Sequence, residues 1–362
     1  MNKDTLCIIY GTDPSEMVPR LLDGVTDLFP SDRTAGIALK PNLVVPSPST
    51  TGATTDPRIV DALLSWLRGS GYSDISIIES AWVGERDTHE AFSVCGYTEL
   101  SRKWDVPLID LKGDETRTMT AGDLSIDVCA KALDAGFLIN LPVLKGHCQT
   151  RMTCALKNLK GCIPDREKRR FHRLGLHKPI AALGAILRPH LTIVDGIIGD
   201  LNFEEGGTPV RMDRLIMGLD PVRIDTYVAS LMGYAPEDIG YIPLAASMGA
   251  GETGPTAIEE LNSPEDSTGT LSQDGRVARY ARYIDDRDAC SACYGSLMHA
   301  IDRMGEGWAR RLDRTFRVGQ AYRGQSPDGI GIGACCAGCP VHVPGCPPSA
   351  RDIIDALEKI DS

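Results

Sequence analysis

The sequence predicts an α/β fold: a layered, mostly parallel or mixed sheet flanked by helices, followed by a smaller C-terminal cysteine-rich segment. Two observations support this prediction. Short apolar runs alternate with capped amphipathic segments through the first two-thirds of the chain, which is the pattern of strands alternating with helices. Six of the twelve cysteines lie between residues 290 and 346, where that alternation has ended.

Each element is expected from a local signal. The first strand is expected at residues 6–10, an apolar run that ends before Gly11. Helices are expected to begin after Asp13 and Asp56, because each is followed by Pro, the pattern of an N-cap with Pro at the first helical position. The first of these should end at about residue 28. The remaining strands are expected at residues 36–40, 74–78, 106–111, 136–141 and 191–194, and the remaining helices at residues 178–187, 221–232, 292–304 and 349–360.

The chain has 362 residues, which is too long for one small core. We predict an α/β domain over residues 1–245 and a cysteine-rich segment over residues 281–362. Between them, residues 246–280 are rich in Gly, Thr, Ser and acidic residues, which is typical of a linker or an irregular segment.

The composition restricts the partners. A net charge of −11 argues against a general nucleic-acid binder, which needs a basic surface. No apolar run approaches the roughly 20 residues of a membrane helix, and no secretory leader is recognisable. We therefore expect a cytoplasmic protein. A basic stretch at residues 157–178 indicates either a local anionic partner or a solvated face.

Clustered cysteines in a reducing compartment indicate metal or redox chemistry. Cys290 and Cys293 form a C-x-x-C motif, and Cys346 is followed by two prolines. Thiolates are the usual ligands of a 4Fe-4S cluster, four for each cluster. Cys335 is the expected fourth ligand, and Cys336 or Cys339 is an alternative. Zinc is the alternative metal, but residues 294–334 separate the two groups, more than the ~12–20 residues typical of zinc knuckles. A third alternative is that the cysteines form a redox-active dithiol.

Polar residues follow several predicted strands, and ligands of such sheets bind beyond the carboxyl ends of strands. These residues are Lys40, Asn42, Glu79, Ser80, Lys145, His147 and Asp195. A lysine here can pair with a carboxylate or phosphate, and His147 can transfer a proton near neutral pH. The alternatives are a hydrogen-bonded structural histidine and solvated surface lysines.

Five ordered motifs, at residues 39–43, 141–147, 155–161, 193–197 and 220–225, resemble those of domain-of-unknown-function family 362. The resemblance spans about residues 37 to 233 and implies an attached iron–sulfur segment. The family is distantly similar to lactate racemase-like proteins, whose substrates are small hydroxy acids. The resemblance marks as candidate site residues Lys40, Glu79, Lys145, His147, Lys157, Asn158, Asp195 and Asp225.

These observations lead to one functional hypothesis and two alternatives. We expect an iron–sulfur oxidoreductase or electron-transfer protein that acts on a small anionic substrate, with a redox protein as a candidate partner. Lys145 and His147 are the expected catalytic residues. The expected substrate-binding residues are Lys40, Asn42, Glu79, Lys157, Asn158 and Asp195. The alternatives are a non-redox isomerase or lyase with a structural or Lewis-acid cluster, and a zinc-stabilised binding module.

Overall fold

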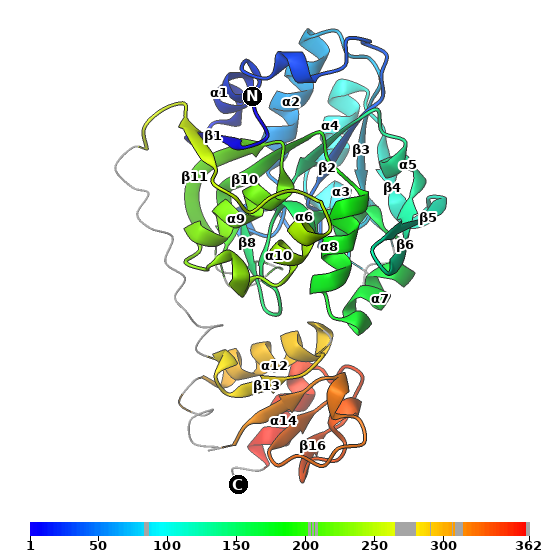
Figure 1. Ribbon diagram of the computed structural model, residues 1–362, viewed down its shortest axis with the longest axis vertical. Coiled ribbons are helices and arrows are strands. Elements are labelled where there is room, and N and C mark those ends of the chain that lie inside the picture. Colours follow the sequence, from blue (N-terminus) through cyan, green and yellow to red (C-terminus); the bar gives the residue numbers. More distant parts are fainter. Residues whose placement is uncertain are drawn as a thin grey trace. The chain divides into compact units, whose positions relative to one another are not determined.

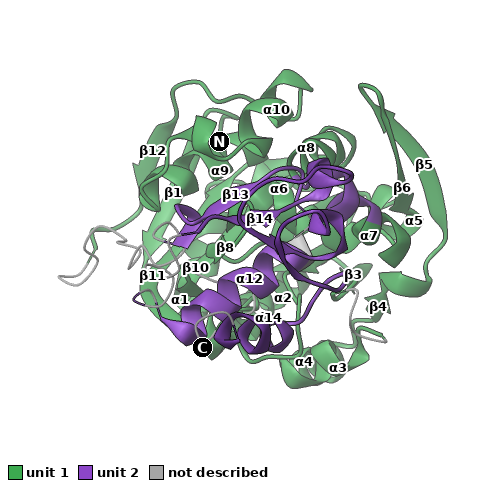
Figure 2. Ribbon diagram, turned by 90° about the horizontal axis from the view of Figure 1, so that it is seen from below, with its two compact units in different colours: residues 1–169, 177–272 green, residues 170–176, 273–362 purple. Residues whose placement is uncertain are grey.

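The chain forms two compact units in a computed structural model (Figure 1). Unit 1 comprises residues 1–169 and 177–272, and unit 2 comprises residues 170–176 and 273–362 (Figure 2). The structure describes residues 1–82, 87–201, 204, 206, 209–264, 280–289, 291–305, 307 and 314–359.

Unit 1 is built on a mixed sheet, whose described strands number eight in the order β12-β1-β11-β10-β7-β2-β3-β4. Their bounds are Ala257–Glu260 (β12), Thr5–Tyr10 (β1), Pro209–Gly218 (β11), Leu191–Asp200 (β10), Phe137–Leu141 (β7), Ile37–Pro41 (β2), Ile75–Glu79 (β3) and Leu108–Asp110 (β4). From β10 to β4 neighbouring strands are parallel, whereas β11 is antiparallel to both β1 and β10. The predicted α/β class is confirmed.

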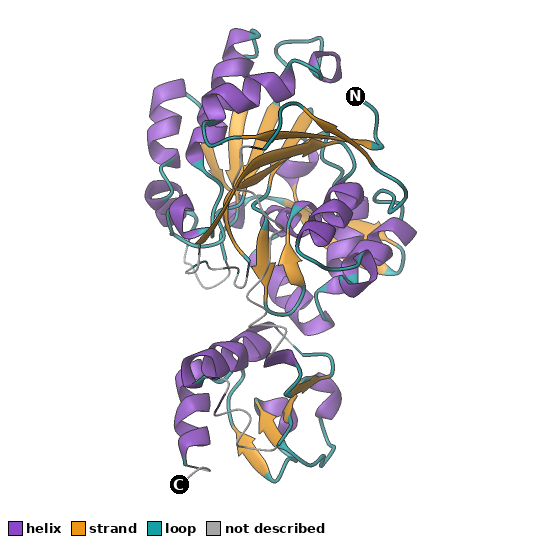
Figure 3. Cartoon of the chain, turned by 90° about the vertical axis from the view of Figure 1, so that its left-hand side faces the viewer, coloured by secondary structure: helices purple, strands orange, loops and turns teal. Residues whose placement is uncertain are grey.

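Helices flank this sheet on both sides (Figure 3). The helices α1 (Pro14–Leu22) and α2 (Pro57–Gly69) share one apolar core with the sheet strands. The other helices of unit 1 include α3 (His89–Val94), α4 (Tyr97–Trp104), α5 (Ala130–Leu133), α6 (Ala155–Asn158), α8 (His177–Ile186), α9 (Pro221–Leu231) and α10 (Tyr241–Ser247). The helix α7 (Asp165–Leu174) has its first half in unit 1 and its second half in unit 2.

The caps predicted at Asp13 and Asp56 are present, and each carboxylate accepts a backbone N–H two residues on. The expected end of the first helix at residue 28 is wrong. The helix α1 ends at Leu22, and a separate 3-10 turn follows at Thr26–Leu28. Gly24 lies in the break, and glycine is a poor helix former because it loses the most backbone freedom on folding.

The strand expected at residues 191–194 is longer than predicted. The strand β10 continues to Asp200, although Asp195 and Gly196 interrupt the apolar run. The antiparallel strand β11 was not predicted, although its first half alternates charged and apolar residues, which is itself a strand pattern. Two hairpins also escaped prediction: β5 (Thr116–Ala121) with β6 (Leu124–Cys129), and β8 (Lys145–His147) with β9 (Arg151–Thr153).

Unit 2 contains a small parallel sheet in the order β13-β14-β15-β16. Its described strands span only Ile284–Asp286, Phe316–Val318, Ile330–Ile332 and Val341–Val343. The helices α12 (Ser291–Met304) and α14 (Ala350–Glu358) pack against each other. Across the described parts of both units, every helix is too short or too polar to cross a membrane.

Candidate functional site

A buried ion pair lies at the carboxyl ends of β2 and β3. Lys40 Nζ is 2.8 Å from Glu79 Oε2, and both side chains are excluded from solvent. The other oxygen of Glu79 accepts the backbone N–H of Ser80. A methyl group at Gly161 would overlap Glu79 Oε1 and lie 2.5 Å from Lys40 Nζ. The glycine therefore gives the backbone of residue 161 room to approach this pair.

Asparagine side chains connect the Lys40–Glu79 pair to Asn140, near the end of β7. Asn158, at the end of α6, accepts hydrogen bonds at Oδ1 from Asn42 Nδ2 at 2.9 Å and from Lys40 Nζ at 3.4 Å. Its Nδ2 donates to Asn140 Oδ1 at 2.8 Å. Lys145 then extends the network, because its Nζ donates to Asn42 Oδ1 at 2.9 Å and to the carbonyl of Ala53 at 2.5 Å.

Glu204 completes the network and was not predicted. Its carbonyl accepts from Lys145 Nζ at 2.9 Å, and its carboxylate lies 2.5 Å from Lys157 Nζ and 3.2 Å from His147 Nε2. Burial alone would raise the pKa of Glu204, but the charge of Lys157 and the contact with His147 hold the pKa well below its usual range. Two adjacent glutamates in a Gly-containing stretch give no sequence signal for this role.

His147 is buried and has a fixed hydrogen-bonding pattern. Its Nδ1 accepts the backbone N–H groups of Gln149 and Thr150 at 3.1 and 3.0 Å. The proton of the neutral ring therefore lies on Nε2, which faces Glu204. Burial, reinforced by the charge of Lys157, lowers the pKa of His147 to about 4. The imidazole is neutral at pH 7.

The basic stretch at residues 157–178 is not simply a solvated face. Lys157 and Lys168 are 3% and 5% exposed. Lys168 Nζ donates to the carbonyls of Ser80 and Ala81, each at 2.7 Å, and to Ser80 Oγ at 2.5 Å. Burial lowers the pKa of Lys168 to about 8, and burial together with Lys157 lowers the pKa of Lys160 to about 7.

Asp195 and Asp225 have a different setting. Asp195 accepts the backbone N–H groups of Asp56 and Ile197 at 2.8 and 3.0 Å. Asp225 accepts those of Ala155 and Leu156, at the start of α6, at 2.7 and 3.1 Å. Burial raises the pKa of both carboxyl groups to about 7. These contacts position α2 and α6, the latter of which carries Lys157 and Asn158.

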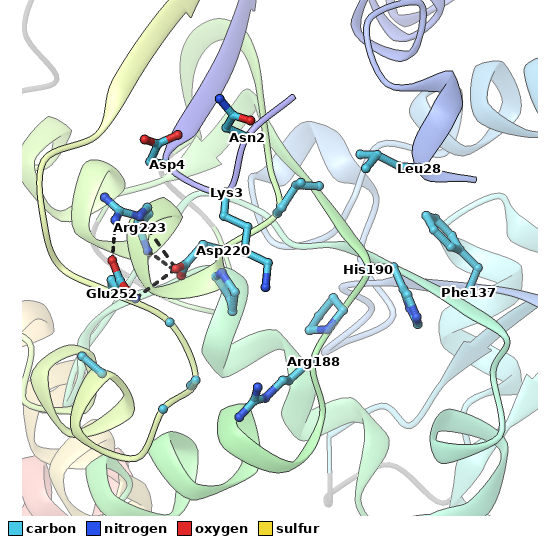
Figure 4. A pocket seen from close by; sticks show the side chains of 17 residues that line it. Asn2, Lys3, Asp4, Leu28, Phe137, Arg188, His190, Asp220, Arg223 and Glu252 are labelled. Carbon is cyan, nitrogen blue, oxygen red and sulfur yellow. Dashed lines mark hydrogen bonds and ion pairs between the residues drawn. The ribbon is translucent and has the colours of Figure 1, made fainter. Parts of the chain in front are cut away.

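A separate cavity of about 1020 Å³ lies by the amino ends of β7 and β10 (Figure 4). None of the predicted site residues lines it. Arg223 donates to Glu252 at 2.7 Å, and Asp220 accepts the backbone N–H of Glu252 at 2.9 Å. These lining charges are thus paired with one another.

In unit 2, Cys293 faces the turn that follows β15. A methyl group at Gly333 would lie 3.1 Å from Cys293 Sγ. The backbone N–H of Ala334 donates to the carbonyl of Gly345 at 2.7 Å, so the residues that precede Cys335 and Cys346 in the chain lie side by side. Cys290 falls outside the described residues.

The two alternative ligands have another environment. Cys336 and Cys339 form a small buried cluster with Tyr322, and burial raises the pKa of Cys336 to about 11. Cys335 instead accepts a hydrogen bond from Arg323 Nε at 3.3 Å. Among the described residues, no three His, Cys, Asp or Glu side chains are grouped closely enough to hold a metal ion.

Fold and site together define an α/β protein with a buried, lysine-rich polar network beyond the carboxyl ends of its parallel strands. Residues 37–230 match the model of the family described as Domain of unknown function (DUF362), and the chain belongs to that family. The resemblance inferred from the motifs is confirmed, and the matched region contains every predicted site residue of unit 1.

Known proteins that are similar to this chain include a curated protein and a solved structure. Thylakoid-associated protein sll1697 from a Synechocystis species is 26% identical over 250 residues, which cover 66% of this chain and 74% of that protein. The lactate racemase apoprotein from Thermoanaerobacterium thermosaccharolyticum is 13% identical, with a TM-score of 0.41. That match covers 59% of this chain and 54% of the racemase chain, about half its length.

Proposed function

We propose that the protein is a cytoplasmic iron–sulfur oxidoreductase or electron-transfer protein. In this proposal, unit 1 binds a small anionic substrate at the lysine network. Unit 2 binds a 4Fe-4S cluster, and a redox protein exchanges electrons with it.

The main support for the substrate site is that the polar side chains of the lysine network form one connected set of contacts. Five of the eight predicted substrate and catalytic residues contact one another in a chain from Glu79 to Lys145, and Glu204 links Lys145 to Lys157 and His147. The ammonium groups of Lys40, Lys145 and Lys157 lie along this network among the described residues. Lysine side chains gathered beyond strand ends can pair with a carboxylate or phosphate, so the network supports an anion site.

The side chains suit distinct tasks in this proposal. Lys145 and Lys157 would bind and orient the anion. His147, neutral at pH 7 with its proton on Nε2, would hold or move a proton at that atom. Asn42 would keep Lys145 in place, and Asn158 would keep Lys40 in place, each through its amide oxygen.

In unit 2, the cluster would be held by Cys290, Cys293, Cys335 and Cys346. The nearness of Cys293 Sγ to the backbone of Gly333 and the hydrogen bond from Ala334 to Gly345 bring the chain segments of the last three close together, but these thiols, all within the described residues, are not yet grouped as ligands in the structure. Thiolate is the donor that iron–sulfur clusters require, and a bound cluster supplies one-electron transfer.

The cluster is tested by anaerobic purification with iron, sulfide and zinc assays and EPR of the reduced protein. We expect about four irons and four sulfides for each chain, with their loss in Cys293→Ser and Cys346→Ser. Cys7→Ser, a change in the core of unit 1, is the matched control and should retain them. A colourless protein with stoichiometric zinc would contradict the proposal.

The anion site is tested by calorimetric titration with acetate and phosphate. Lys157→Gln and Lys145→Gln should weaken binding at least tenfold, since each removes a charge that contacts the anion. Lys178→Gln is the control, because Lys178 is exposed and pairs with Asp123. Equal binding by all four proteins would exclude the lysine network as the site.

A further inference from the structure

The carboxylate of Glu204 bridges the two groups best placed to receive an anion. One oxygen lies 2.5 Å from Lys157 Nζ, and the other lies 3.2 Å from His147 Nε2. The Glu204 side chain is 19% exposed, whereas those of Lys157 and His147 are 2% and 4% exposed. Glu204 is therefore the member of this trio that lies nearest to solvent.

We propose that Glu204 is an internal competitor of the substrate, whose carboxylate takes the same position between Lys157 and His147. The residue thereby sets both the affinity of the site and its selectivity for small carboxylates. This inference rests on the proposed anion site and specifies the chemical class of its ligand.

The donors on either side of the Glu204 carboxylate suit its replacement by a substrate carboxylate. A carboxylate offers two coplanar oxygens, and here each oxygen meets a different donor. A substrate carboxylate can make the same two contacts, so the buried lysine stays neutralised throughout. If the substrate bound without displacing Glu204, two carboxylates would crowd one ammonium group, and like charges at such distances repel strongly.

Displacement of Glu204 is also the least costly way to open the position. Its side chain is partly exposed, so the released carboxylate can reach solvent and be hydrated. Lys157 also donates to Thr153 Oγ1 at 3.1 Å, and His147 is held through Nδ1 by two backbone N–H groups. These donors therefore remain in place when the carboxylate leaves.

The test compares acetate binding by the wild type, Glu204→Gln and Glu252→Gln, by calorimetry at constant pH and ionic strength. Glutamine keeps the shape of Glu204 but lacks the competing charge, so acetate should bind on the order of tenfold more tightly. Glu252→Gln removes the same charge from an exposed side chain at the other cavity. Its affinity should equal that of the wild type.

Two results separate this inference from the proposed function. If acetate binds the wild type, and Lys157→Gln abolishes binding while Glu204→Gln leaves it unchanged or weaker, the competitor role is wrong and the anion site stands. If neither the wild type nor Glu204→Gln binds acetate or phosphate, the anion site itself is wrong.

A second variant tests the same inference if Glu204→Gln folds poorly. Glu204→Ala leaves the space of the carboxylate empty, and formate should fill it. Formate should then raise the thermal unfolding midpoint of Glu204→Ala more than that of the wild type. An equal rise in both proteins would overturn the inference.

Discussion

His147 illustrates how burial alters the chemistry of a single residue. Its pKa is lowered from 6.5 to about 4 by burial and by Lys157. Between these values the unfolded chain binds a proton that the folded protein does not. The contribution of neutral His147 to stability is therefore complete above about pH 6.5 and is lost as the pH falls toward 4.

We expect His147→Gln to lack this component. Urea unfolding of the wild type at several pH values from 4.5 to 7.5 should show a steeper loss of stability toward acid, by up to about 1.4 kcal/mol for each pH unit. Parallel curves for the two proteins would show that His147 titrates normally.

The Lys40–Glu79 pair predicts a large effect from the loss of one partner. Lys40→Met leaves the carboxylate of Glu79 buried without its ammonium and should cost about 3–5 kcal/mol in urea unfolding. Lys178→Met breaks an exposed pair with Asp123 and should cost less than about 1 kcal/mol. Lys40→Met combined with Glu79→Leu should be more stable than Lys40→Met alone. A single variant as mild as Lys178→Met would refute this account.

Gly161 shows how one short element depends on close approach. It lies in the 3-10 turn Leu159–Cys162 that follows α6, and a methyl group there would displace Glu79 or Lys40. Gly161→Ala should cost about 1–3 kcal/mol through overpacking. Gly69→Ala, at the end of α2 with nothing within 4 Å, should be neutral or stabilising by up to about 1 kcal/mol. Equal unfolding midpoints for the two variants would contradict this.

At the scale of elements, helices with local start signals were predictable from the sequence. Asp13 and Asp56 accept backbone N–H groups of the first turns that they begin. Interactions between near neighbours in the sequence were therefore sufficient to predict where these helices start. The strand β11 and the end of β10 depend on pairing with each other across the sheet. The end of β10 and the start of β11 carry polar residues among the apolar ones, so no continuous apolar run marks either segment.

At the scale of the whole molecule, the two units should differ in what stabilises them. The strands β13 to β16 are three residues each, which limits the apolar core they can build. Under the proposed function, binding of the cluster contributes directly to folding of unit 2. The larger sheet of unit 1 has its own core and needs no such support.

Removal of the cluster by oxidation and chelation should therefore destabilise unit 2 alone. Hydrogen exchange followed by mass spectrometry should show faster exchange in β14 and β15, with β2, β7 and β10 unchanged. The control is wild-type protein exposed to the chelator without oxidation. Unchanged protection of β14 and β15 after iron loss would contradict a stabilising cluster.

The sequence by itself determined the α/β class and the family, and it predicted a site at Lys40, Asn42, Glu79, Lys145, His147, Lys157 and Asn158. These predictions depend on local patterns and motifs that the sequence alone displays. Only the tertiary structure decided that these residues form one buried network, that Asp195 and Asp225 hold backbone N–H groups, and that Glu204 joins Lys157 and His147. The physical reason is that counter-charges and close packing are set by residues distant in sequence, which approach each other only when the sheet is assembled.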